Sequence, residues 1–127
     1  MKPITYANIA REVLAVAPGF RMAFDEHVRD NSGVLQHVLF GDLTRYFIAQ
    51  YRAARGGEQA SAEEVAKLTS LLERTLTQSR DESLQTLIVT SFLENLWQAA
   101  EDYEGIRIAL GPALRAALDK LDNLEVR

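Results

Sequence analysis

Apolar side chains recur every three or four residues along most of the chain, which is the period of an amphipathic α-helix. The segments with this period span residues 4–16, 20–30, 35–54, 61–78, 83–100, 106–110 and 112–123. No segment alternates with period two over the length of a strand. We therefore predict an all-α, single-domain protein of about six helices, either a closed helical bundle or a short HEAT-like helical stack.

The stretch Ser83–Ala100 is the most apolar long segment and is predicted to be the central helix of the fold. On a helical wheel its apolar side chains cover about half of the circumference, so more than one neighbouring helix is expected to pack around it. We expect Ile88, Phe92 and Leu96 in the core. The opposite, polar stripe consists of Thr90, Glu94, Gln98 and Glu101.

Several short patterns predict where helices begin. Ser61 with Glu64, and Ser79 with Glu82, have the spacing of a capping box, and Pro112 stands at a first-turn position. Gly41 interrupts the helix predicted over residues 35–54. Either a neighbouring backbone approaches closely at Gly41, or the helix restarts there with Asp42 as its N-cap.

Composition and charge narrow the classes of function. The chain contains no cysteine, which excludes disulfides, thiolate catalysis and thiolate metal sites. No signal-peptide core and no apolar run of membrane-spanning length is seen, so we expect a cytoplasmic protein without a membrane partner. The net charge of -4 argues against nucleic-acid binding and favours a basic protein partner.

The sharpest polar grouping lies in the sequence HVLFGDLTRYF, which contains His37, Asp42 and Arg45. Asp42 precedes Arg45 by three residues, so a local ion pair is expected. The grouping is either a His-carboxylate acid/base site, a polar contact patch, or a capped helix that orders the turn after Asn31.

We predict neither a metal nor a cofactor, and no enzymatic activity. The two histidines, His27 and His37, stand on different predicted helices without a His-x-x-x-His or Glu-x-x-His pair. Each is expected to be either hydrogen-bonded within the fold or exposed. No phosphate loop, dinucleotide fingerprint or nucleophile elbow is present.

Acidic residues gather at the end of the predicted central helix, where they oppose the helix dipole. They are either a solvated rim or a patch that receives a basic partner beside Trp97 and Tyr103. These two aromatic residues are typical of a core or its boundary, and either becomes the first interface candidate if it is exposed. The acidic residues are Glu94, Glu101, Asp102 and Glu104.

The segments HVLFGDLTRYF (37–47), SFLENL (91–96) and LGPAL (110–114) resemble a family of small all-helical bacterial proteins described as a domain of unknown function. The helix order also resembles helical immunity proteins, the small partners that neutralise toxins passed between competing bacteria. The resemblance implies a bacterial binding protein and carries no catalytic residues.

The function that we predict is a protein-binding module, an immunity protein that occludes a basic toxin domain. The alternative is a regulatory or self-associating helical protein, so homo-oligomer formation stays open. The residues that we expect to contact the partner are Asp42, Arg45, Glu94, Trp97, Glu101, Asp102, Tyr103 and Glu104.

Overall fold

The computed structural model describes residues 3–125 and contains helical elements without a strand among those residues. The all-α, single-domain prediction is confirmed. In chain order the elements are α1 (Ile9–Val16), η1 (Pro18–Phe20), α2 (Arg21–Asn31), α3 (Gln36–Arg55), α4 (Gln59–Gln78), α5 (Glu82–Thr86), η2 (Leu87–Phe92), η3 (Leu93–Asp102), α6 (Tyr103–Ala109) and α7 (Pro112–Glu125). No helix in this described part is long and apolar enough to cross a membrane.

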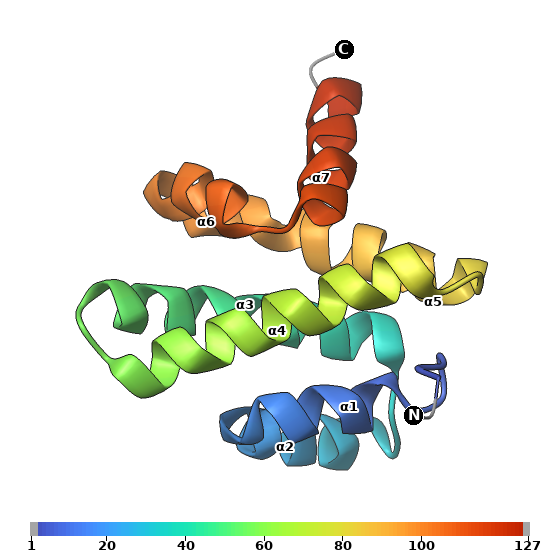
Figure 1. Ribbon diagram of the computed structural model, residues 1–127. Helices are drawn as coiled ribbons and strands as arrows, with labels where there is room; N and C mark the ends of the chain where they lie inside the picture. The colour runs from blue at the N-terminus through green and yellow to red at the C-terminus, as the bar shows by residue number, and fades with distance from the viewer. Residues whose placement is uncertain (1–2, 126–127) are drawn as a thin grey trace.

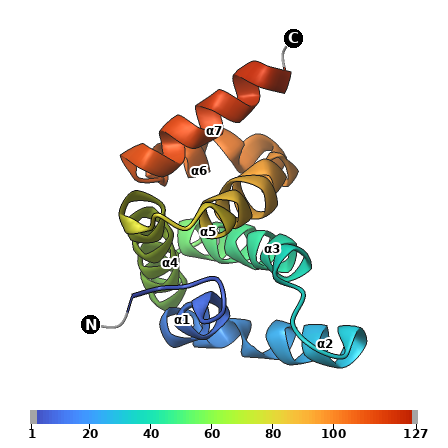
Figure 2. The same ribbon diagram turned by 90° about the vertical axis from the view of Figure 1, so that its right-hand side faces the viewer.

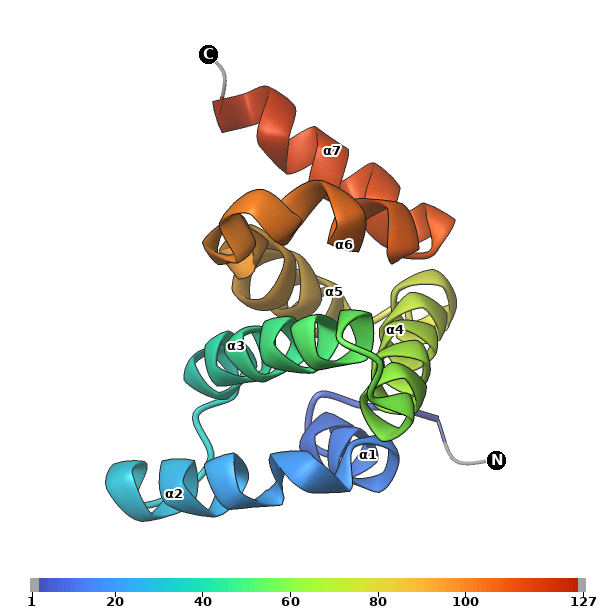
Figure 3. The same ribbon diagram turned by 90° about the vertical axis from the view of Figure 1, so that its left-hand side faces the viewer.

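The elements follow one another through the molecule in three layers (Figure 1). The first layer holds α1 and α2, the second holds the side-by-side pair α3 and α4, and the third runs from α5 to α7 (Figures 2 and 3). Helix α4 contacts both α1 and α7, and α3 contacts η2 and η3. The far end of α7 projects away from the other elements (Figure 1). Helices α3 and α4 therefore connect the first layer to the last.

The core is continuous between the second and third layers. The rings of Phe47 on α3 and Phe92 on η2 meet edge to face, with their centroids 5.4 Å apart. Both are fully buried, as are Ile88 and Leu96. An edge-to-face pair adds about 0.5–1.5 kcal/mol to the burial of its two rings. The predicted core role of Ile88, Phe92 and Leu96 is confirmed.

The segment predicted as one central helix is divided into three kinds of turn. After α5 the chain widens into the π-helix η2 and then tightens into the 3₁₀ turns of η3. Within η3 there is a kink at Ala100, where φ is 53° and ψ is -117°. A side chain with a Cβ atom is strained at positive φ. The apolar pattern thus identified which residues are buried, while the regular α-helix that we predicted over 83–100 is wrong.

Both capping boxes are wrong in detail. Helix α4 begins at Gln59, so Ser61 lies inside it, buried, and its hydroxyl donates to Gln50 Oε1 over 2.7 Å. At α5 the cap is Asp81, whose Oδ1 accepts the N–H of Ser83 over 2.9 Å. Only at α5 does another side chain, that of Asp81, take the role that the spacing assigned to serine, whereas the N-cap residue of α4, Glu58, makes no side-chain cap.

The start of α7 confirms the role predicted for Pro112 and adds a partner from another helix. Helix α7 begins at Pro112. The carboxylate of Glu73 on α4 accepts the N–H groups of Ala113 and Leu114 over 2.8 and 2.9 Å. These bonds satisfy two of the N–H groups that a helix leaves open at its start. They also attach α7 to α4.

Helix α3 runs through Gly41 without a restart, so the N-cap alternative for Asp42 is wrong. Gly41 is buried, and a Cβ atom placed there would lie 3.9 Å from Nδ2 of Asn95 on η3. That distance is an ordinary van der Waals contact. The neighbour of Gly41 is therefore a side chain at an ordinary distance, and no neighbouring backbone approaches closely there.

Candidate functional site

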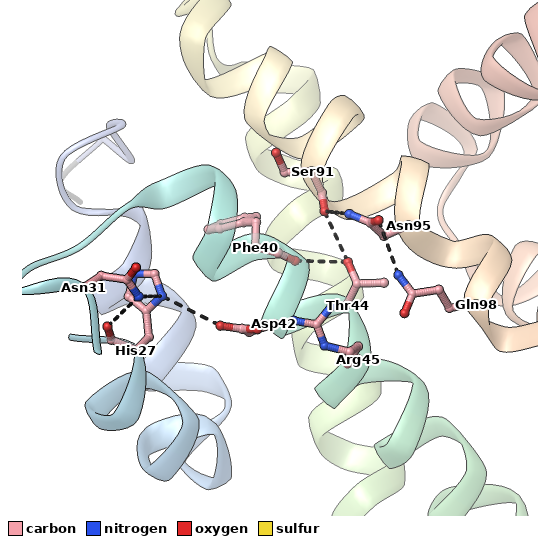
Figure 4. Close-up of polar contacts among 9 residues, drawn as sticks. All are labelled: His27, Asn31, Phe40, Asp42, Thr44, Arg45, Ser91, Asn95 and Gln98. Atoms are coloured by element: carbon pink, nitrogen blue, oxygen red, sulfur yellow. Dashed lines mark hydrogen bonds and ion pairs between the residues drawn. The ribbon is translucent and has the colours of Figure 1, made fainter. Parts of the chain in front are cut away.

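Two regions carry the candidate chemistry, and the first is the corner where α2 meets α3. The predicted ion pair forms between Asp42 Oδ1 and Arg45. The histidine that faces Asp42 is His27 of α2, with its Nδ1 atom 3.7 Å from Asp42 Oδ2 (Figure 4). The sequence could not single out His27, because the two residues are fifteen positions apart and meet only when α2 folds back beside α3.

The imidazole of His27 is fixed in one tautomer. The backbone N–H of Leu35 donates to Nε2 over 2.9 Å, so the proton of the neutral ring lies on Nδ1. The amide nitrogen of Asn31 is 3.4 Å from Nδ1, but it is itself a donor, bonded to the carbonyl oxygen of His27 over 2.9 Å. Since two donors do not pair, Nδ1–H is directed across the gap toward Asp42, beyond hydrogen-bond range.

His37 lies elsewhere, and this overturns the acid/base grouping with Asp42 and Arg45. Its side chain is exposed, and its Nδ1 atom contacts the hydroxyl of Ser91 on η2. On the helical wheel of α3, His37 lies to one side of the face that Asp42 and Arg45 share. The predicted Asp42–Arg45 ion pair is confirmed, and the histidine that lies near it is His27 and not His37.

A cavity of about 450 Å³ opens at this corner between α2 and α3. His27 is 3% exposed and lies at its inner side, while Arg45 is exposed at its rim. The lining residues are Ala23, Glu26, His27, Asp30, Asn31, Asp42, Arg45 and Tyr46. Three carboxylates against one guanidinium give this cavity, which we call the corner cavity, a negative balance.

Polar side chains behind the corner hold the irregular turns of η2. The buried hydroxyl of Thr44 on α3 lies 3.0 Å from the carbonyl oxygens of both Phe40 and Phe92. Nδ2 of Asn95 donates to the carbonyl oxygen of Ser91 over 2.8 Å (Figure 4). Widening a helix to π geometry releases backbone groups from their usual partners, and these side chains supply new ones.

The second region is the outer face of η3. The side chain of Trp97 is 67% exposed there, so the condition that we set for an interface candidate is met. Glu94 and Glu101 on the same element are exposed, as is Glu104 on α6. The depression beside Trp97, against α7, holds only about 10 Å³. This face, which we call the Trp97 face, is therefore an open surface and no small-molecule pocket.

Two residues predicted for the interface point inward instead. Asp102 is 7% exposed and binds Arg52 over 2.8 Å and also Arg55. The hydrogen bond from Arg52, with the charges of both arginines, holds the pKa of Asp102 below its usual value despite its burial. Tyr103 donates its hydroxyl to Asp122 on α7, and burial together with that carboxylate raises the pKa of Tyr103.

Asp102 and Tyr103 are thus anchors of the segment. Arg52 also donates to the carbonyl oxygen of Ala99 over 2.9 Å, next to the kink. Of the acidic residues, Glu104 keeps an exposed position but pairs with Arg107 over 3.0 Å. The part of the acidic cluster that stays available on η3 itself is Glu94 and Glu101.

Within residues 3–125 no group of three or more His, Asp or Glu side chains is arranged to hold a metal ion. The corner cavity and the open Trp97 face are the two regions that hold the polar and aromatic residues predicted for contact with a partner.

Comparison with protein families places the chain in one of them. The family described as Domain of unknown function (DUF7674) matches residues 10–125, so the protein belongs to the DUF7674 family. Neither a curated protein nor a solved structure matches the chain.

Proposed function

We propose that this protein is a non-enzymatic protein-binding module whose interface is centred on Trp97 and whose partner presents a basic surface. The observation that carries the proposal is the 67% exposure of the Trp97 side chain on an element whose other large apolar residues, Leu93 and Leu96, are buried. Leaving a large apolar side chain exposed forgoes part of the free energy, roughly 1.5–3 kcal/mol for side chains such as Leu or Phe, that full burial supplies. Tryptophan is also the residue most enriched among interface hot spots.

Charge around Trp97 supports a basic partner. Glu94 precedes Trp97 by three positions and Glu101 follows it by four, and both are exposed. Carboxylates at the rim of an apolar anchor attract lysine and arginine side chains and accelerate encounter at low salt. An acidic rim also repels a second acidic protein, which gives the surface selectivity.

The anchoring of η3 supports a preorganised interface. Asp102 is held by Arg52 and Arg55 at one end of the element, and Thr44 and Asn95 hold η2 at the other. A surface that is already fixed loses less conformational entropy when it binds. The contacts that stabilise the irregular turns therefore also favour binding.

In its finer form the proposal assigns the partner as a toxin and this protein as its immunity protein. Support comes from the acidic charge around Trp97, which suits a basic toxin domain of the nuclease type, and from the resemblance of the helix order to helical immunity proteins. A protein that covers the active region of an enzyme needs a rigid complementary face and no catalytic group of its own.

The proposal is tested by co-expressing the chain with the product of the neighbouring gene. We expect a complex on affinity capture and rescue of growth when that product is toxic. Trp97→Ala is expected to weaken the complex by about 2 kcal/mol or more, roughly thirtyfold. Met22→Ala is the matched control, because Met22 is 80% exposed and stands on α2 in the opposite layer.

Absence of both complex and rescue would remove the immunity assignment. Equal losses from Trp97→Ala and Met22→Ala would show that binding, if it occurs, does not use the Trp97 face. The two results separate the identity of the partner from the location of the interface.

Self-association is a second candidate because α7 projects from the body of the molecule (Figure 1). Leu124 near its end is 59% exposed. Light scattering at micromolar concentration tests this candidate. A dimer that Leu124→Glu converts to a monomer would support it, and a monomeric wild-type protein would rule it out.

A further inference from the structure

Another cavity, beside α1, α2 and the start of α3, has a lining that is opposite in charge to the Trp97 face. Its volume is about 270 Å³, and we call it the α1–α2 cavity. Its charged lining residues are Arg11 and Arg21, which are both exposed, and most of the other lining residues are apolar. The full lining is Ala7, Ala10, Arg11, Leu14, Arg21, Phe24, Val34 and Gln36. The α1–α2 cavity therefore combines an apolar wall with a positive rim.

A polar atom of one lining residue has no hydrogen-bond partner. Gln36 lines the cavity, and its Nε2 atom donates to the carbonyl oxygen of Tyr6 over 2.7 Å. The other atom of the same amide, Oε1, is buried and accepts no hydrogen bond within the described part of the chain. A buried acceptor without a donor costs about 1–3 kcal/mol. A donor that enters the cavity and reaches Oε1 removes this cost.

The Trp97 face has the complementary features. The side chain of Trp97 is 67% exposed, and the nitrogen of its indole ring is a hydrogen-bond donor only. Glu94 and Asp122 line the depression beside the ring, so the charge around it is negative. An apolar ring with one donor and an acidic rim thus matches an apolar cavity that has an unpaired acceptor and a basic rim.

From this match we propose that Trp97 of one copy of the chain inserts into the α1–α2 cavity of a second copy. The indole ring packs against the apolar wall, and its N–H donates to Oε1 of Gln36. Glu94 approaches Arg11 and Arg21 at the rim. Because this contact uses the Trp97 face, it rests on the proposed function, and it names what covers that face when no other partner is bound.

The contact joins two different surfaces of the same chain. The α1–α2 cavity lies in the first layer and Trp97 in the third, with α3 and α4 between them (Figures 1 and 2). Trp97 therefore cannot fill the cavity of its own chain. Each copy in a pair keeps one surface free, so the association is head-to-tail and extends to longer assemblies at high concentration.

The size and charge of the cavity favour an inserted side chain over a free small molecule. Its volume is below the roughly 300–1,000 Å³ of typical small-molecule sites. The guanidinium of Arg21 already lies over the ring of Phe24, 5.9 Å from its centroid, and a guanidinium attracts the face of a tryptophan more strongly. Asp25 lies 3.5 Å from Arg21, but such an exposed ion pair contributes little and leaves Arg21 able to bind a second carboxylate.

The test is sedimentation velocity of the full chain over a wide range of concentrations, at low and high salt. We expect the wild type to associate with rising concentration, and salt to weaken the association. Trp97→Ala, and Arg11→Glu combined with Arg21→Glu, are each expected to weaken it at least about tenfold. Lys67→Glu combined with Arg80→Glu makes the same change in charge at exposed positions outside the cavity lining, and is expected to associate like the wild type.

A mixing experiment tests the head-to-tail geometry. The Trp97→Ala protein keeps its cavity, and the protein with Arg11→Glu and Arg21→Glu keeps its tryptophan. Equal amounts of the two should therefore form a one-to-one dimer and no larger species. Each protein alone should stay monomeric at the same concentration.

Three results would overturn the proposal. They are a wild type that is monomeric at every concentration, association of the double arginine variant equal to that of the wild type, and the absence of a dimer on mixing. Arg11 and Arg21 lie outside the Trp97 face, so the double arginine variant should still bind the product of the neighbouring gene. A monomeric wild type that binds this product through Trp97 would overturn the self-association and leave the proposed function standing.

Discussion

The corner between α2 and α3 and the outer face of η3 depart in opposite ways from the usual burial of side chains. At the corner a polar ring, His27, is withdrawn from water inside regular α-helices. On η3 a large apolar ring, Trp97, is presented to water by irregular turns. Burying a polar group and exposing a large apolar one both oppose the ordinary tendency of a folded chain. Both regions therefore depart from what the stability of the fold alone favours.

The largest change in the free energy of unfolding is expected at a buried side chain of η2. Phe92→Ala on η2 removes a fully buried ring that meets Phe47 edge to face, so we expect a loss of about 3–5 kcal/mol in the free energy of unfolding. Trp97→Ala, five positions away, is expected to change it by less than about 0.5 kcal/mol. Urea unfolding of both variants measures the contrast, and a large loss from Trp97→Ala would contradict it.

A smaller loss is expected where α3 supports η2. Thr44→Val keeps the shape of the side chain but removes the hydroxyl that faces the carbonyl oxygen of Phe92. Leaving a buried acceptor without its donor costs about 1–3 kcal/mol. Chemical denaturation gives the value. A variant as stable as the wild type would show that the irregular turns do not depend on this contact.

A gain is expected at the kink. Ala100 has φ of 53° and ψ of -117°, a conformation that glycine adopts without the steric cost of a Cβ atom. Ala100→Gly should therefore raise the free energy of unfolding by about 1 kcal/mol. Thermal unfolding detects the change as a higher Tm. A lower Tm would mean that Ala100 is not strained in solution.

The smallest expected effect is the pH dependence that Asp102 contributes. Its pKa is lower in the folded state because Arg52 and Arg55 favour the carboxylate. The group binds its proton more readily in the unfolded chain, so this stabilisation is complete above the unfolded pKa near 4 and is lost as the pH falls through the folded pKa. Solvent around the two exposed arginines screens the interaction and keeps it modest.

Unfolding measured between pH 6 and pH 2.5 tests this sign. The wild type should lose more stability on acidification than Asp102→Asn, in which the titrating group is absent. Equal pH profiles for the two proteins would show that the pair with Arg52 does not shift the carboxyl group of Asp102.

The hydrophobic pattern predicted the burial of Ile88, Phe92 and Leu96 because a π or 3₁₀ turn leaves most inward positions inward. It could not predict the kind of turn, because that depends on contacts between distant residues. The hydroxyl of Thr44, for example, contacts Phe92 on η2, forty-eight residues further along the chain. The Asp42–Arg45 pair was predictable because both residues share one helix.

Contacts between side chains of two different helices could not be predicted from the sequence. His27 reaches Asp42 only through the turn after α2, and Asp102 is withdrawn from the acidic cluster by arginines of α3. Counting charges along the chain identified the cluster but not which carboxylates face solvent. The exposure of Trp97 was the decisive fact, and the apolar side of a helical wheel suggests the opposite.

The most direct test of the Trp97 face uses the fluorescence of Trp97, the sole tryptophan of the chain. We expect emission at the wavelength of water-exposed indole, efficient quenching by acrylamide, and stronger quenching by caesium than by iodide once each ion is normalised to free tryptophan amide. The preference for the cation reports the acidic surroundings of the ring, where Glu94 lines the same depression as Trp97. Blue-shifted emission that resists acrylamide would show that Trp97 is buried, and a preference for iodide would show that its surroundings are not acidic.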